Sequence, residues 1–222
     1  MPCSLFFTLK LQEMKHLIFT VTTIFLFTNV FAQSKNSKIK TRFGIKAGYN
    51  YINTTGISSI DGSNASGFHA GVFASGVDEN IKLTSDLLFS KQGYKYKSGK
   101  VNMYYLTTTE TADFFVVEDV LKLQIGLQLG YLLSAKADSS GTSFNNATKK
   151  PTEYFNRFSF GIAGGAEFIS ESGIVIGIRY TVGINNIMKK QGTTIPVPAF
   201  LPSSSDASIK SNVFQLYAGF RF

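Results

Sequence analysis

Two residue types that stabilise many exported proteins are almost absent from this sequence. Its 222 residues include no tryptophan and a single cysteine, Cys3. One cysteine cannot form an internal disulfide, and Cys3 lies in a segment that we expect to be removed. The mature chain then has no thiol for catalysis, and it must be stable without disulfide bonds.

Charge of one sign is not concentrated anywhere in the chain. Lys and Arg number 22 against 14 Asp and Glu, but no more than two basic residues stand together. Domains that bind nucleic acid gather positive charge in one run or on one face, so we expect no nucleic acid partner. The excess of positive charge instead favours attraction to an anionic lipid surface.

Long hydrophobic runs are also missing, and the nearest to one stands close to the start. Lys15 precedes an apolar stretch over residues 17–27, and Val30 and Ala32 are small residues three and one positions before Gln33. This order predicts a secretory signal peptide over residues 1–32, cut after Ala32, with Met14 as the natural start. A transmembrane helix is the alternative, but it needs about 20 apolar residues, and this stretch is shorter and contains threonines. Loss of the signal removes two lysines and one glutamate and leaves a formal net charge of about +7.

Alternation of apolar and polar residues is what the rest of the chain has in abundance. The clearest case is "LKLQIGLQLGYLL", where leucine, isoleucine and tyrosine occupy every second position from Leu121 to Leu133. This period of two is typical of β-strands. The pattern predicts eight strands, at residues 42–52, 67–77, 81–92, 102–116, 120–135, 155–170, 173–186 and 211–222. The fourth strand fits the alternation least well, and its register stays open.

The connections between these strands alternate in length. The short ones fall at residues 78–80, 117–120 and 170–173, and the long ones at 53–66, 93–101, 136–154 and 187–210. An even number of strands with short turns at one end and long loops at the other is typical of outer-membrane barrels. We therefore predict an all-β fold, an eight-stranded antiparallel up-and-down transmembrane β-barrel over residues 42–222, after a short periplasmic segment at 33–41. Both termini would face the periplasm of a Gram-negative cell.

The positions of the glycines indicate which face of the barrel meets lipid. A soluble, lipocalin-type barrel also alternates, so alternation alone leaves both readings open. An eight-stranded barrel has an interior only wide enough for its own side chains, and bulky residues would overfill it. The face that carries most strand glycines should therefore be the interior, and the bulky apolar face should meet hydrocarbon. These glycines are Gly44, Gly48, Gly71, Gly126, Gly130, Gly161, Gly165, Gly177, Gly183 and Gly219.

Charged residues share the predicted interior face with the glycines. Unpaired charges in a narrow lumen would be costly, so we expect a structural network of ion pairs and hydrogen bonds that plugs the barrel. A selective pore lined by basic groups is the sharper alternative, but eight strands leave no aqueous channel. The residues predicted for the network are Lys46, Asp86, Lys122, Glu167, Arg179 and Arg221.

His69 is the only histidine after the predicted signal. A small outer-membrane barrel that modifies lipid would need at least a serine and a carboxylate beside it, and nothing in the sequence places either there. One histidine is also too few for a typical metal site. We expect no catalytic activity, no cofactor and no metal, and an outer-membrane lipid-modifying enzyme stays a lesser alternative.

Four segments resemble the PorT-type outer-membrane barrel family of Bacteroidetes. They are "FGIKAGYNY" near the start of the mature chain, "LQLGYLLSAK", "FGIAGGAEF" and the final "FQLYAGFRF". The resemblance implies an eight-stranded outer-membrane barrel, with Phe220 and Phe222 as a C-terminal signal for insertion by the barrel-assembly machinery. It also implies a link to surface-protein secretion, with which the founding member is associated. The chain departs from the family in the fourth strand, where "YLTTTET" stands in place of a sequence such as "YLEIPLL".

The expected role is that of a monomeric structural or interaction protein. It would contact outer-membrane lipid and present four surface loops to envelope partners. A component of a surface-protein secretion or envelope-assembly apparatus is the alternative. The loop at 193–208, "TTIPVPAFLPSSSDAS", combines prolines with apolar residues, and it could contact a partner or fold over the barrel rim.

Overall fold

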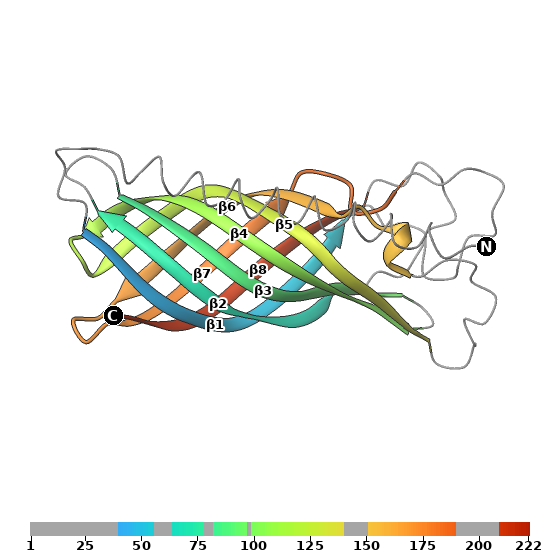
Figure 1. Cartoon of the computed structure of the whole chain (residues 1–222), viewed down its shortest axis with the longest axis horizontal. Helices are drawn as coiled ribbons and strands as arrows, with labels where there is room; N and C mark the ends of the chain where they lie inside the picture. The colour runs from blue at the N-terminus through green and yellow to red at the C-terminus, as the bar shows by residue number, and fades with distance from the viewer. Residues whose placement is uncertain (1–39, 56–63, 78–81, 97–98, 140–150, 190–208) are drawn as a thin grey trace, which may run out of the picture. The chain divides into compact units, whose positions relative to one another are not determined.

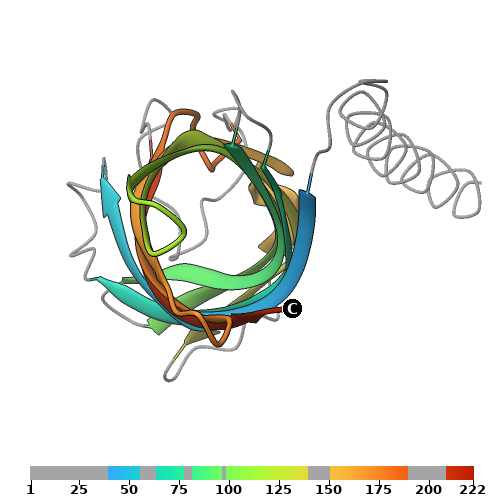
Figure 2. The same cartoon turned by 90° about the vertical axis from the view of Figure 1, so that its left-hand side faces the viewer.

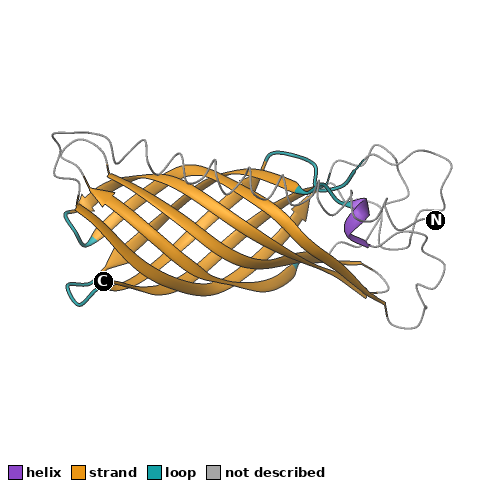
Figure 3. Ribbon diagram, in the orientation of Figure 1, coloured by secondary structure: helices purple, strands orange, loops and turns teal. Residues whose placement is uncertain are grey.

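The described part of the chain forms one barrel of eight strands (Figures 1 and 3). The computed structural model describes residues 40–55, 64–77, 82–96, 99–139, 151–189 and 209–222. A short 3₁₀-helix, η2 (Pro151–Tyr154), stands between the fifth and sixth strands. The strands are β1 (Lys40–Thr55), β2 (Ala65–Val77), β3 (Lys82–Tyr96), β4 (Gly99–Val117), β5 (Leu121–Ser139), β6 (Phe158–Ile169), β7 (Ile174–Gly183) and β8 (Lys210–Arg221).

Each strand pairs antiparallel with its neighbours in sequence, and β1 closes the barrel against β8. Ala47 stands opposite Ala218 at this seam, and the strands form the ring seen in Figure 2. Within the closed ring, the backbone of every strand is paired on both sides and no edge is free. The predicted eight-stranded up-and-down barrel is therefore confirmed.

Burial alternates along the strands as the sequence predicts. In β7 the large side chains of Ile174, Ile176 and Ile178 are exposed on the outer wall, whereas Val175 and Arg179 are buried inside. The glycines on the polar face make room for large side chains of the interior. A Cβ on Gly44 would lie 2.4 Å from the Phe73 ring, and one on Gly177 would lie 2.4 Å from the Tyr217 ring.

The register of β4, which the sequence leaves open, places its threonines on both faces. The inward residues Thr107, Thr109, Thr111 and Asp113 are buried, and Glu110 is exposed on the outer wall. Two register shifts interrupt the pairing of β4 with β5, between Tyr104 and Tyr105 and between Phe115 and Val117. Asp113 therefore belongs to the interior.

The prediction of a loop over residues 93–101 is wrong. β3 and β4 continue as a paired hairpin as far as Tyr96 and Gly99, and β5 continues to Ser139. These three strands project beyond the others at the right-hand end of Figure 1. The alternation persists in this projection, but here the apolar residues point inward and the polar residues point outward. A pattern that requires apolar residues on the outward face therefore predicts a loop.

The two tight turns that the structure describes agree with the sequence. Residues 118–120 turn between β4 and β5, where Asp119 has a φ of 55°, and Gly173 adopts a φ of 90° before β7. The turn predicted at 78–80, the signal peptide at 1–32, the segment at 33–39 and the loop at 193–208 lie outside the described residues. No helix in the described residues has both the length and the apolar character to span a membrane.

Candidate functional site: the filled lumen

The middle of the lumen holds six charged side chains from six different strands. Arg179 Nη1 lies 2.5 Å from Asp86 Oδ2, and Lys46 Nζ lies 2.9 Å from Asp86 Oδ1. Lys122 Nζ lies 2.8 Å from Asp113 Oδ2 and 2.9 Å from Glu167 Oε1. We call this set the charge cluster: Lys46, Asp86, Asp113, Lys122, Glu167 and Arg179.

The charge cluster is electrically balanced and closed to solvent. It contains three cations and three carboxylates, and the side chains in its ion pairs are at most 3% exposed. Lys46 Nζ also lies 3.5 Å from Glu167 Oε2, so the pairs form one connected set. Buried charges are tolerated only when they are paired in this way.

Neutral polar groups complete the surroundings of the charge cluster. Gln124 donates to Asp113 Oδ1 at 3.1 Å and accepts from Arg179 Nη2 at 3.3 Å. The Tyr217 hydroxyl donates to Glu167 Oε2 at 3.0 Å. Lys46 Nζ lies 4.7 Å from the centre of the Tyr217 ring, in a cation–π contact. Together with the Arg179–Asp86 pair, which joins β7 to β3, these contacts connect opposite walls of the barrel through its interior.

Five of the six residues predicted for the network lie in the charge cluster, where Lys46, Lys122 and Arg179 each pair with Asp86 or Glu167. The exception is Arg221, which lies near the end of β8, is partly exposed and forms no ion pair within the described residues. Asp113 takes part instead and was missed, because the register of its strand was open.

His69 belongs to a separate polar group nearer the end of the lumen from which β3, β4 and β5 project. Its Nδ1 lies 2.7 Å from Asn50 Oδ1, which also accepts from Gln215 Nε2 at 3.1 Å. Asn50 Nδ2 donates to Ser90 Oγ at 3.0 Å. His69 and Ser90 are each 1% exposed, so a substrate has no direct access to them. Among the described residues, no group of three or more His, Cys, Asp or Glu side chains could hold a metal ion.

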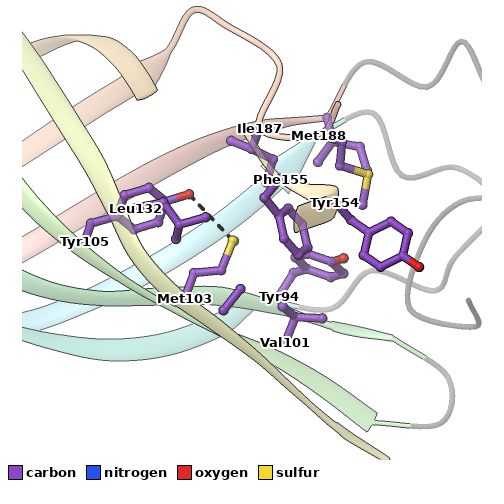
Figure 4. Packing of buried hydrophobic residues seen from close by; sticks show 11 residues of the cluster. Tyr94, Val101, Met103, Tyr105, Leu132, Tyr154, Phe155, Ile187 and Met188 are labelled. Carbon is purple, nitrogen blue, oxygen red and sulfur yellow. Dashed lines mark hydrogen bonds between the residues drawn. The ribbon is translucent and has the colours of Figure 1, made fainter. Parts of the chain in front are cut away.

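An apolar core closes the end of the barrel from which β3, β4 and β5 project, next to a small cavity beside Thr107, Gln128 and Thr181. Figure 4 shows its side chains converging from the projecting strands, from η2 and from the segment after β7. The Thr152 side chain connects η2 to β5 by accepting from the backbone N–H of Ala135 at 3.0 Å. The core, which we call the outer core, consists of Tyr94, Val101, Met103, Tyr105, Leu132, Ala135, Tyr154, Phe155, Ile187, Met188 and Ile209.

A smaller apolar cluster lies toward the other end of the barrel. It consists of Phe73, Ile169, Val175 and Tyr217, each at most 3% exposed. The charge cluster is thus accompanied by buried apolar side chains toward both ends of the lumen. Phe220 and Phe222, the residues of the predicted insertion signal, are 45% and 71% exposed, and their role in insertion stays a prediction.

The model of a known family, described as the outer membrane protein beta-barrel domain, matches residues 31–189. The chain belongs to this family. Membership decides between the two barrels that the alternation left open: this is an outer-membrane barrel, and its apolar wall faces lipid. No curated protein matches the chain.

This chain is similar to several solved outer-membrane proteins at low identity. Ail, the attachment invasion locus protein of Yersinia pestis, is 18% identical, with a TM-score of 0.46 over 82% of this chain and 99% of that chain. OprG from Pseudomonas aeruginosa is 13% identical, with a TM-score of 0.43 over 83% and 97%. The outer membrane enzyme PagL is 11% identical, with a TM-score of 0.39 over 79% and 98%. Likeness at this level concerns the fold alone.

Proposed function

We propose that this protein is a non-conducting, non-catalytic outer-membrane barrel that holds an extracellular platform in place for contacts with envelope partners. The observation that carries the proposal is the balanced charge cluster, which fills the lumen between buried apolar side chains. A pore selective for one sign of ion would need a hydrated lining with an excess of the opposite charge. The interior instead connects opposite walls and makes the barrel rigid.

Conductance in planar lipid bilayers tests the closed lumen. The purified mature chain should give no current steps, while a large porin inserted into the same bilayers gives them. Ohmic steps from the mature chain would overturn the proposal, above all if Lys46→Glu reversed the preferred sign of ion.

The environment of His69 supports a structural role for that residue. Its Nδ1 contacts the amide oxygen of Asn50, and within the described residues no carboxylate forms a hydrogen bond with its ring. The expected result is that a deletion strain complemented with the wild type or with His69→Ala has the same outer-membrane lipids by mass spectrometry. A lipid modification that is lost on deletion and restored by the wild type, but not by His69→Ala, would make the protein an enzyme.

Lysines at the rim of the projecting strands support contact with lipid headgroups, and they support the predicted orientation of the barrel. Lys95, Lys100 and Lys136 stand on the outward face of the projecting strands, beyond Phe89 and Tyr104 of the apolar wall. Lys95 is directly opposite Lys100, and like charges in that position repel one another. Anionic phosphates of the outer leaflet would relieve this repulsion, and both termini would then lie in the periplasm.

Labelling of whole cells tests this orientation cleanly, because the predicted mature chain has no cysteine. A membrane-impermeant maleimide should label Lys95→Cys in the projecting hairpin. It should not label Glu118→Cys in the opposite turn until the cells are broken. The reverse pattern would place the termini outside.

A PorT-type role in surface-protein secretion is the second candidate. It is supported by the four segments that resemble that family, including the final strand with Phe220 and Phe222. Isolation under mild detergent should then recover envelope proteins together with the barrel. Recovery of the barrel alone, with normal surface proteins in a deletion strain, would count against this role.

A further inference from the structure

The lipid-facing wall of the barrel is uneven. From β5 to β8 it carries mostly large apolar side chains, such as Ile125 and Ile178. On β2, β3 and β4, one region carries small and polar residues in their place. We call this region the polar patch: Ala74, Ser85, Thr108, Glu110 and Ala112.

The polar patch lies within the depth of the hydrocarbon. Along the outward face of β4, Glu110 stands between Phe114 and Tyr104. Aromatic residues at these positions mark the two membrane interfaces of an outer-membrane barrel. On the neighbouring strands, Glu110 stands level with Ser85 on one side and Leu127 on the other. Its carboxyl group is therefore far from either headgroup layer.

Glu110 is poorly suited to contact with lipid alone. Ser85 Oγ donates to Glu110 Oε2, and Thr108 Oγ1 lies 3.3 Å from Oε1. No ion pair joins Glu110 to a cation in the part of the chain that the structure describes, and the side chain is exposed. An ionisable group at this depth is costly against hydrocarbon, and such groups commonly face protein.

The composition of the polar patch matches a second copy of itself. Ala74 stands opposite Ser85, and Ser85 opposite Glu110, so two small side chains lie beside the carboxyl group in one row across three strands. Small residues let two membrane proteins approach closely. The row also contains both hydroxyl donors and carboxyl acceptors. A two-fold axis through it would bring each Glu110 beside the hydroxyl groups of the other copy.

We propose that the polar patch is a lateral interface between two copies of this protein in the outer membrane. The pairing replaces the monomer expected from the sequence, and it does not depend on the lumen being closed. Within the dimer, hydroxyl groups of both copies surround the Glu110 carboxyl groups, and the bulky wall of β5 to β8 faces lipid.

Oxidative cross-linking in native membranes tests the interface, again because the predicted mature chain has no cysteine. Ser85→Cys should give a product of twice the monomer mass, several-fold more abundant than the product from Ile178→Cys. Ile178 is the matched control, because it is exposed to lipid on β7, four strands away around the ring. If Ser85→Cys does not fold, as judged by loss of its heat-dependent gel mobility, Ala112→Cys tests the same face.

A second change in the Ser85→Cys background separates a specific contact from random collision. Ala74→Phe should lower the yield of dimer several-fold, because the large ring keeps the two walls apart. Ile162→Phe on β6 is the control and should leave the yield unchanged. Equal cross-linking at Ser85 and Ile178 would overturn the proposal. A product joined to a different membrane protein would also overturn it, since the occupant of the patch would then not be a second copy.

Discussion

The strands β3, β4 and β5 have opposite polarity in their two halves. In the membrane half, Leu123 and Ile125 face outward, while Lys122 and Gln124 are buried inside. In the projecting half, Lys95 and Lys100 face outward, and Tyr94, Val101 and Met103 are buried inside. The backbone alternates in the same way throughout, and only the residue type on each face is exchanged.

This reversal shows that the medium around the wall, lipid or water, decides which residue types fill the interior, and that the barrel backbone does not. Within the bilayer the outer face is mostly apolar, and the lumen holds the paired charges. Beyond the bilayer the same strands meet water, and the ordinary arrangement of a soluble protein returns, with an apolar core and a charged surface. One barrel thus contains two kinds of core, the charge cluster and the outer core.

The largest expected effect comes from breaking the charge cluster. Asp86→Ala leaves Lys46 and Arg179 buried without their shared carboxylate, and loss of one partner of a buried ion pair costs about 3–5 kcal/mol. The free energy of unfolding can be followed in urea by far-UV circular dichroism, since the chain has no tryptophan. Glu118→Ala is the matched control, because its ion pair with Lys82 is largely exposed and should contribute at most about 1 kcal/mol.

A double variant sharpens this test. Removing the Arg179 side chain together with Asp86 also removes a charge that would otherwise be unpaired. The loss in the double variant should therefore be smaller than the sum of the two single losses. Additive losses would mean that the two residues do not act as a pair.

The next effect concerns the outer core. Leu132 is fully buried, and Leu132→Ala should cost about 2–5 kcal/mol through lost contacts and the cavity left behind. The damage should be local: faster proteolysis of the projecting strands, with the heat-dependent gel mobility of the membrane section retained. Leu133→Ala is the control, since its side chain is 41% exposed. Equal sensitivity of both variants would show that the outer core is not a packed unit.

The smallest expected effect tests the wall itself. Ile178→Lys places a charge against hydrocarbon and should cost about 2–4 kcal/mol near the middle of the bilayer. The reciprocal change, Lys95→Ile, affects a wall that meets water and should alter the free energy of unfolding by no more than about 0.5 kcal/mol. Urea unfolding in lipid vesicles measures both. Similar losses from the two changes would contradict the division of the barrel into membrane and water sections.

The membrane section was largely predictable because its signals are local. Alternation from Leu121 to Leu133 gives β5, and the glycines opposite Phe73 and Tyr217 indicate which face is the interior. The charges of Lys46, Asp86, Lys122, Glu167 and Arg179 could be assigned to the lumen by the same parity. Their pairing partners could not be assigned, since the partners lie on strands that are distant in sequence.

Two features depended on contacts across the ring of strands. Pairing with β3 and β5 sets the register of β4. That register places Asp113 in the charge cluster and Glu110 on the lipid-facing wall. The outer core required residues as distant in sequence as Tyr94 and Ile209 to meet above the lumen. Periodicity along one strand therefore specifies a closed barrel with a polar interior. The register between strands decides which charges pair, where the polarity reverses and which wall carries a carboxylate. The reason is that hydrogen bonding across the sheet sets the height of each side chain in the barrel.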